Sequence, residues 1–225
     1  LFRPAYSVQA RELTQMQTIL QNQIERLGSH FFKEGSVVIP GQTGFDITYS
    51  YVKLQSTFTV SGTTHTAENF RTSLVGVKLT GATTGVIAKV INTTAADSSD
   101  DLTVFVKYES SGTVAGGTTK TVFANGEKLT TDTAIAYTSG GSTVTIAAAG
   151  EAALTASSAA SGVGSSASVQ KGIFYIRGAF VQAATQTIIL DKYSNSPSYR
   201  IGFAITESLV TPEENTGLLD NSTGS

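Results

Sequence analysis

Apolar residues recur every three or four positions along residues 7–35, which is the period of an amphipathic helix. Neither glycine nor proline interrupts the segment between Ser7 and Leu27. Ser7 is placed to cap the first turn, and Gly28 or Gly35 can supply the left-handed residue that ends a helix. The pattern therefore predicts one long helix within residues 1–35. Its apolar stripe consists of Leu13, Met16, Leu20 and Leu27, widened by Ile19, Ile24 and Phe31.

This stripe has two alternative neighbours, the subunit's own sheet or other copies of the same helix. The first alternative has the helix lying across its own sheet, because the coiled-coil spacing lasts for about two and a half heptads where about three to four argue for a coiled coil. In the second, the helix packs around a threefold axis and Gln23 is a polar seam residue that sets the register. In this second alternative, sister subunits contact Leu13, Met16, Leu20 and Leu27, whereas the subunit's own sheet packs against Ile19, Ile24 and Phe31.

Beyond the helix, the chain changes to runs in which apolar and polar residues alternate. Such alternation favours antiparallel sheet with one buried face. From residue 75 the runs become shorter and are separated by turn residues, as in a small β-barrel or sandwich. We therefore predict a mainly β fold with one long N-terminal helix. It consists of an antiparallel β-sandwich or barrel base domain (36–74 and 169–225) and an inserted small β-barrel-like domain (75–149).

The last third of the chain contains two contrasting segments. Residues 150–168 are almost entirely Ala, Ser and Gly, which bury little apolar surface, so we predict a loop or linker. Strongly apolar strands then resume in GIFYIRGAFVQA, TQTIILDKY and SYRIGFAITESLV. Thr211 begins a turn or short helix in which Glu214 reaches back to the cap. Because the chain starts at Leu1 and its tail ends without a stop signal, we expect a processed product or a piece of a longer protein.

Composition narrows the functional classes. The 225 residues are 40% hydrophobic and only 14% charged, with a formal net charge of −2. No cluster of Lys and Arg is present to follow a phosphate backbone, so nucleic acid is not an expected partner. No apolar run approaches the ~20 residues that span a bilayer, so no membrane insertion is expected. Cysteine is absent, which excludes disulfides and thiolate metal ligands.

Candidate metal ligands are few and scattered. His30 and His65 are the only histidines, and neither has a ligand partner at helical or hairpin spacing. Asp97, Asp100 and Asp101 could offer oxygen atoms to Ca²⁺, but they lack the glycine and terminal glutamate of an EF-hand loop. The expected structure at these aspartates is a solvated hairpin turn.

Motifs of catalysis are also missing. GATTGVIAKV has two glycines four residues apart, but no GK[ST] follows, so it predicts a β-turn and a strand rather than a phosphate-binding loop. Glu213 and Glu214 are adjacent and point apart on a helix or a strand, so they do not form an acid–base pair. The sequence therefore predicts no enzyme, no catalytic residue, no bound metal and no cofactor.

Two stretches of the chain resemble a known family. They are LFRPAYSVQARELTQMQTILQNQIERLGSHFFKEGSVVIPG and GIFYIRGAFVQAATQTIILDKYSNSPSYRIGFAITESLVTPEEN. Both are similar to the N-terminal region of tail-fibre and baseplate virion proteins of tailed bacteriophages, cyanophage-like proteins that carry the domain of unknown function DUF4815. Ala5 stands where that family is expected to have Gly. The phrases GATTGVIAKV and FANGEKL are similar to β insertions of phage adhesion-device proteins.

The resemblance implies a structural virion component at the distal tail, assembled in the host cytoplasm. Such a subunit anchors a tail fibre to the baseplate or forms part of the baseplate, and its partners are two copies of itself and other tail proteins. The resemblance implies no catalytic residues.

A second functional class stays open on the residues alone. It is a receptor- or glycan-binding adhesin module, from a phage or from a bacterial surface. In this interpretation Tyr108 and Tyr137 lie on exposed loops of the insertion and stack against a sugar.

Overall fold

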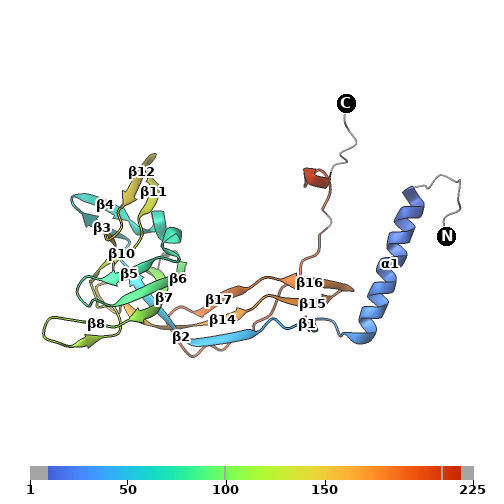
Figure 1. The fold of residues 1–225 in the computed structure, drawn as a ribbon, viewed down its shortest axis with the longest axis horizontal. Helices are drawn as coiled ribbons and strands as arrows, with labels where there is room; N and C mark the ends of the chain where they lie inside the picture. The colour runs from blue at the N-terminus through green and yellow to red at the C-terminus, as the bar shows by residue number, and fades with distance from the viewer. Residues whose placement is uncertain (1–9, 99, 209, 219–225) are drawn as a thin grey trace.

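The computed structural model describes residues 10–98, 100–208 and 210–218, and it shows an elongated molecule (Figure 1). A compact β part lies at one end, and a narrow ribbon of long strands leads away from it. A small sheet and the helix α1 lie at the other end of the ribbon. The chain runs along the ribbon repeatedly, so strands from the beginning and the end of the sequence lie side by side there.

The predicted fold class is confirmed, since the chain is 45% strand and 15% helical and its sheets are antiparallel. The helical elements are α1 (Ala10–Phe31) and the 3₁₀-helices η1 (Ala67–Leu74) and η2 (Thr216–Leu218). The strands are β1 (Val37–Ile39), β2 (Thr43–Leu54), β3 (Thr57–Val60), β4 (Thr63–Thr66), β5 (Lys78–Gly81), β6 (Ile87–Thr94), β7 (Leu102–Ser110), β8 (Gly112–Thr113), β9 (Thr119–Lys120), β10 (Lys128–Thr131), β11 (Ile135–Ser139), β12 (Ser142–Ile146), β13 (Glu151–Leu154), β14 (Ser161–Val169), β15 (Gly172–Ile176), β16 (Ala179–Ala183) and β17 (Gln186–Asp191).

The largest sheet has eight antiparallel strands in the order β13-β10-β5-β6-β7-β2-β14-β17. Strand β2 is the longest, and its two halves have different neighbours. Residues 51–54 pair with β7 in the compact part, whereas residues 43–50 pair only with β14. The ribbon consists of residues 43–50 of β2 together with β14 and β17. A separate sheet, β1-β15-β16, lies beyond the ribbon and is called the small sheet below.

The core of the compact part lies between the large sheet and the elements that cover it, namely η1 and the hairpins β3–β4 and β11–β12. Burying one large apolar side chain contributes about 1.5–3 kcal/mol, and this core contains no described residue of α1. The largest fully buried members are Phe70, Leu54, Leu74, Leu79, Leu102 and Leu129.

The predicted loop or linker at residues 150–168 is wrong. Strand β13 pairs with β10, and β14 lies in the middle of the ribbon between β2 and β17. Small residues are needed here because neighbouring side chains fill the space: a Cβ at Gly162 would lie 2.6 Å from the Tyr51 hydroxyl oxygen. Composition misled the prediction because strands of small residues can be buried by the larger residues of adjacent strands.

The predicted boundary at residue 75 does not separate two structural units. Phe70 of the predicted base domain lies in the same core as Leu79 and Leu102 of the predicted insertion. Strand β2 also pairs directly with β7 across this boundary. The reason is that β2 is long enough to belong both to the compact part and to the ribbon. The structural division therefore falls within β2 and not at residue 75.

The run SYRIGFAITESLV is predicted to be a strand, but the described part of the chain gives it no strand partner. Residues 198–208 are extended and make no backbone–backbone hydrogen bond with described residues. A strand needs a neighbour for its N–H and C=O groups, and local alternation cannot guarantee one. The turn that follows is confirmed, because the Thr211 N–H donates to the Glu214 carboxylate at 3.2 Å.

A buried carboxylate joins two turns of the compact part. Glu127 is only 2% exposed. One of its oxygens accepts hydrogen bonds from the backbone N–H groups of Thr83 and Thr84. The other accepts from the Thr84 hydroxyl and from the Ala124 N–H. A buried polar side chain is tolerated here because each of its oxygens has hydrogen-bond donors.

Replacing Glu127 with Gln should destabilise the compact part by about 2–4 kcal/mol, because the new amide –NH₂ group would face donors that the carboxylate now satisfies. Urea unfolding followed by circular dichroism measures this loss. The matched control is Glu109→Gln, which removes an exposed 2.8 Å ion pair with Lys78 and should cost less than about 1 kcal/mol. Equal unfolding midpoints for the two variants would show that the Glu127 bonds contribute little.

Candidate functional site

The two histidines do not come together in the structure. His30 lies on the exposed last turn of α1. His65 lies in β4, not in a loop, and is buried with its Nδ1 atom 2.7 Å from the Tyr137 hydroxyl. Its ring stacks on Phe58 with centroids 5.2 Å apart. His65 is therefore part of the packing of the compact part.

The aspartates considered for calcium flank the turn between β6 and β7 and bind a lysine. The Lys192 ammonium lies 3.0 Å from an Asp100 oxygen and 3.6 Å from an Asp97 oxygen. The hydrogen bond to Asp100 is the main cause that raises the pKa of Lys192. Among the described residues, no group of three or more His, Cys, Asp or Glu side chains is arranged to hold a metal ion. The ion pairs instead fasten the end of β17 to the compact part.

The tyrosines considered for sugar binding do not lie on exposed loops, so that prediction is wrong. Tyr137 lies in β11 and is 7% exposed. Tyr108 lies in β7 and is half-buried, with its ring 5.6 Å from that of Phe123. Burial raises the pKa of the Tyr108 hydroxyl. Both rings serve the core, because the strands that carry them turn these side chains inward.

The most unusual surface of the molecule is the apolar stripe of α1, which faces solvent along its whole length. Its side chains are between 42% and 74% exposed. Gln23, in the middle of the seam, is exposed as well. The helix continues through Gly28, Gly35 adopts the left-handed conformation just after it, and the predicted cap Ser7 lies outside the described residues. The stripe consists of Leu13, Met16, Ile19, Leu20, Ile24, Leu27 and Phe31.

The prediction that Ile19, Ile24 and Phe31 pack on the subunit's own sheet must be corrected. All three are more than half exposed. They miss the sheet because the helix stands across the end of the ribbon and does not lie along it (Figure 1). The stripe therefore lacks a partner within the described chain.

The contact between α1 and the small sheet is made by other residues near the C-terminal end of the helix. Of residues 11–31, only Gly28 is buried. The Tyr175 hydroxyl donates to the Glu25 carbonyl at 2.9 Å, and the Phe32 ring lies 5.7 Å from those of Tyr175 and Phe180. Burial raises the pKa of Tyr175. Gly28 is the residue from which this contact could have been found, but the helix pattern alone predicts that Gly28 ends the helix.

One face of the ribbon carries an exposed apolar row of side chains, and this face is called the apolar face of the ribbon below. Directly paired residues of neighbouring strands share a face, and one such row is Phe45, Ala167 and Ile188. Phe45 is 72% exposed and Ile188 is 46% exposed. The next row, on the opposite face, is Gly44, Ser168 and Thr187. Antiparallel sheets normally bury such an apolar row, and in the ribbon it is open to solvent.

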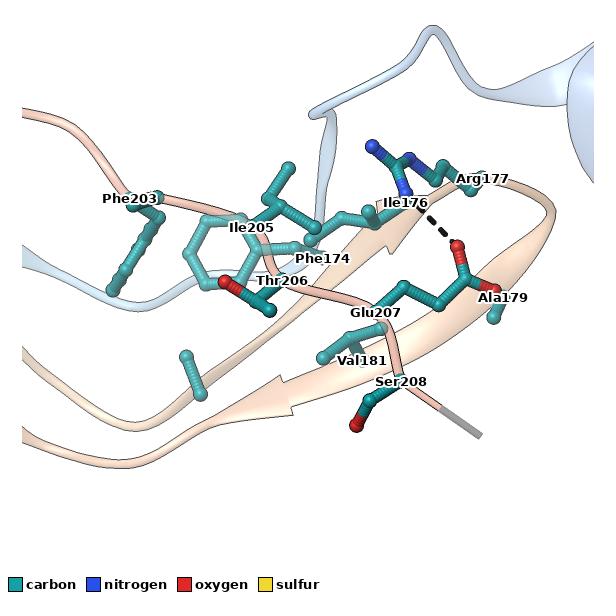
Figure 2. Close-up of a pocket in the computed structure, with 12 residues that line it drawn as sticks. Phe174, Ile176, Arg177, Ala179, Val181, Phe203, Ile205, Thr206, Glu207 and Ser208 are labelled. Atoms are coloured by element: carbon teal, nitrogen blue, oxygen red, sulfur yellow. Dashed lines mark hydrogen bonds and ion pairs between the residues drawn. The ribbon is translucent and has the colours of Figure 1, made fainter. Parts of the chain in front are cut away.

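The segment of residues 199–208, called the C-terminal segment below, runs beside β17 and then over the small sheet. Figure 2 shows the second contact, where a cavity of about 490 Å³ separates the C-terminal segment from β15 and β16. The Phe203 ring lies 5.2 Å from that of Phe174, and Glu207 forms a 2.9 Å ion pair with Arg177. Apolar side chains line the cavity from both sides, so the segment is held at a few points without being packed along its length.

The total exposed area agrees with these local observations. The chain has an accessible surface of 14716 Å². A compact monomer of the same mass is expected to expose about 9,700 Å², so roughly 5,000 Å² is in excess. Obligate interfaces bury about 2,000–5,000 Å² in total, shared between two partners. The excess is therefore large enough for each subunit to contact two neighbours.

Comparison with known proteins gives no assignment. No family model, no curated protein and no solved structure matches the chain. Among the described residues, no helix combines the length and the apolar character that are needed to cross a membrane. The functional argument therefore depends on the surfaces described above, which we call together the open apolar surface: the stripe of α1 and the apolar face of the ribbon.

Replacing Gly28 with Ala should loosen α1 from the small sheet. Alanine normally stabilises a helix by about 1 kcal/mol relative to glycine, but a Cβ here would lie 2.5 Å from the Tyr175 ring. Such overpacking costs about 1–3 kcal/mol, so trypsin should cleave after the exposed Lys33 about tenfold faster. The exposed neighbour Ser29, replaced with Ala, is the control and should leave the rate unchanged. Unchanged cleavage in both variants would contradict the tight contact.

Proposed function

We propose that this protein is a structural subunit that assembles with copies of itself through the open apolar surface. The observation that carries the proposal is the stripe of α1, because a monomer gains nothing by exposing seven large apolar side chains on one helix face. The core of the compact part is complete without the helix, so the stripe is not needed for folding that part. Its role is therefore contact with another molecule.

Three features favour a second copy of the chain as that molecule and a threefold arrangement. The seam spacing of three and four residues along α1 is that of helices packed on one another. Ile19 and Ile24 widen the stripe, as expected for a helix with two helical neighbours and not one. Gln23 can bond to its equivalents across an axis and so set the register. The excess surface also suffices for two neighbours per subunit.

We further propose that the trimer is a virion component of a phage tail, where it anchors a fibre to the baseplate or forms part of the baseplate. The support is the sequence resemblance of both ends of the chain, together with an architecture suited to a structural subunit of a larger assembly. Described residues form an elongated body with a compact end and an assembly end (Figure 1). Within them, His65, Tyr108 and Tyr137 serve packing, and Asp97 and Asp100 form ion pairs with Lys192. An adhesin that stacks a sugar on Tyr108 and Tyr137 has no such support.

Replacing Leu20 with Asp should dissociate the oligomer without unfolding the compact part. Three charges at a buried axis cost several kcal/mol, so the association constant should fall at least about 100-fold. Size-exclusion chromatography with light scattering measures the mass, and thermal unfolding checks the fold. The matched control is Asn22→Asp, which places the same charge about 200° around the helix from Leu20, on its polar face. A monomeric unmodified protein, or equal behaviour of the two variants, would contradict a helix core.

The number of copies per particle tests the placement in a tail. Quantitative mass spectrometry of purified particles of the phage that encodes the chain should give three copies, or a small multiple of three, per tail. This follows from the closed symmetry of homo-oligomers at a single tail axis. Hundreds of copies per particle would instead indicate a capsid or tail-tube protein, and absence from the particle would remove the virion assignment.

A further inference from the structure

The C-terminal segment has the side-chain pattern of a strand with one buried face. Apolar and small or polar residues alternate strictly: Tyr199, Ile201, Phe203 and Ile205 alternate with Arg200, Gly202, Ala204 and Thr206. The four apolar side chains are all exposed, at 37–62%. A period of two residues places these side chains on one side of an extended backbone. The pattern is therefore that of a strand that covers an apolar layer.

Its backbone is nevertheless unpaired. Residues 198–208 are extended but make no backbone–backbone hydrogen bond with any described residue. Unpaired N–H and C=O groups along an extended, apolar segment are a template for pairing with another chain. A strand of this kind is completed by a neighbour that the single chain does not provide.

The C-terminal segment runs beside a strand edge that is also unpaired. Strand β17 is the last strand of the large sheet, and its outer edge has no partner among the described strands. Residues 199–202 lie along Ile188, Ile189 and Leu190 but are separated from them by an open groove of about 310 Å³. Two unpaired backbone edges therefore lie next to each other without bonding over residues 199–202.

We propose that the C-terminal segment is exchanged between copies: in the oligomer it forms a strand along the free edge of β17 of a second copy. Exchange of identical elements gives each segment the neighbours it already has within its own chain, which makes it a low-cost route to an oligomer. The new backbone bonds are those of strand addition. This inference rests on the self-assembly proposed above. It further identifies the segment of one subunit that pairs with another subunit.

Continuity with the open apolar surface favours a second copy as the occupant of the edge. The row Phe45, Ala167 and Ile188 ends at β17. A strand added there extends the row by one residue, such as Ile201 or Phe203, and widens the apolar face from three strands to four. The exchange thus enlarges the same surface that the ribbon leaves open.

The natural absence of cysteine makes a direct test simple. Thr187→Cys in β17 is combined, in separate proteins, with Arg200→Cys, Gly202→Cys or Ala204→Cys, all at exposed positions. After oxidation, denaturing electrophoresis should show covalent dimers and trimers for the combination in register, with most chains linked. The control pair, Thr187→Cys with Ser111→Cys at the compact end, should remain monomeric on the same gel.

Three outcomes are decisive. Links within single chains only, in a protein that light scattering shows to be oligomeric, would overturn the exchange and leave self-assembly intact. A monomer at all concentrations would overturn both proposals. Covalent dimers and trimers that depend on the cysteine register, with none in the control, support the exchange.

Hydrogen exchange gives a second measurement that needs no cysteine. In the oligomer, alternate amides of residues 200–206, those that face β17, should exchange about 100-fold more slowly than unbonded amides. The protection should disappear in the dissociated Leu20→Asp variant, in which β10 and the rest of the compact part stay protected. Protection that survives dissociation would mean that the strand pairs within its own chain, and this would overturn the exchange.

Discussion

The antiparallel ladder between β2 and β14 is the interaction on which the shape of this molecule depends. It runs from Val52 paired with Ser161 to Thr43 paired with Val169, and so connects the compact part with the ribbon. Small residues are needed in β14, because Tyr51 occupies the space over Gly162. The same ladder sets which face of the ribbon carries Phe45 and Ile188, and it also sets the distance between the core and the helix. Fold and assembly surface are thus consequences of one pairing.

Much of the fold was accessible from the sequence where local pattern and tertiary contact agree. The helix, the alternating strands of the compact part and the capped turn at Thr211 all follow from residues within one element. The predictions were wrong where the structure of a segment depends on residues that are distant in the sequence. Strands β13 and β14 form within residues 150–168 because β10, β2 and β17 pair with them, and the boundary at residue 75 failed because β2 pairs with β7 across it. Composition contains no information on such neighbours.

The candidate site was predicted in part. The heptad spacing identified the stripe of α1, but not that Ile19, Ile24 and Phe31 would be left without a sheet. The direction of the helix is set by Gly28 against Tyr175, a contact between residues almost 150 positions apart. The C-terminal segment shows the converse case: its alternation predicts a strand, but the described chain supplies no strand to pair with it. A pattern can specify a face without specifying what covers it.

The separation of the compact part from the open apolar surface has a consequence for how such a protein can change over time. The hairpins β8–β9 and β11–β12 lie at the far end of the molecule from α1 and the small sheet (Figure 1). The exposed turns of these hairpins, at Gly116 and Gly117 and at Gly140 and Gly141, have conformations available to glycine and touch little else. Insertions and substitutions there leave the helix and ribbon untouched. Lineages can therefore diversify one end of the chain while the open apolar surface at the other end stays the same.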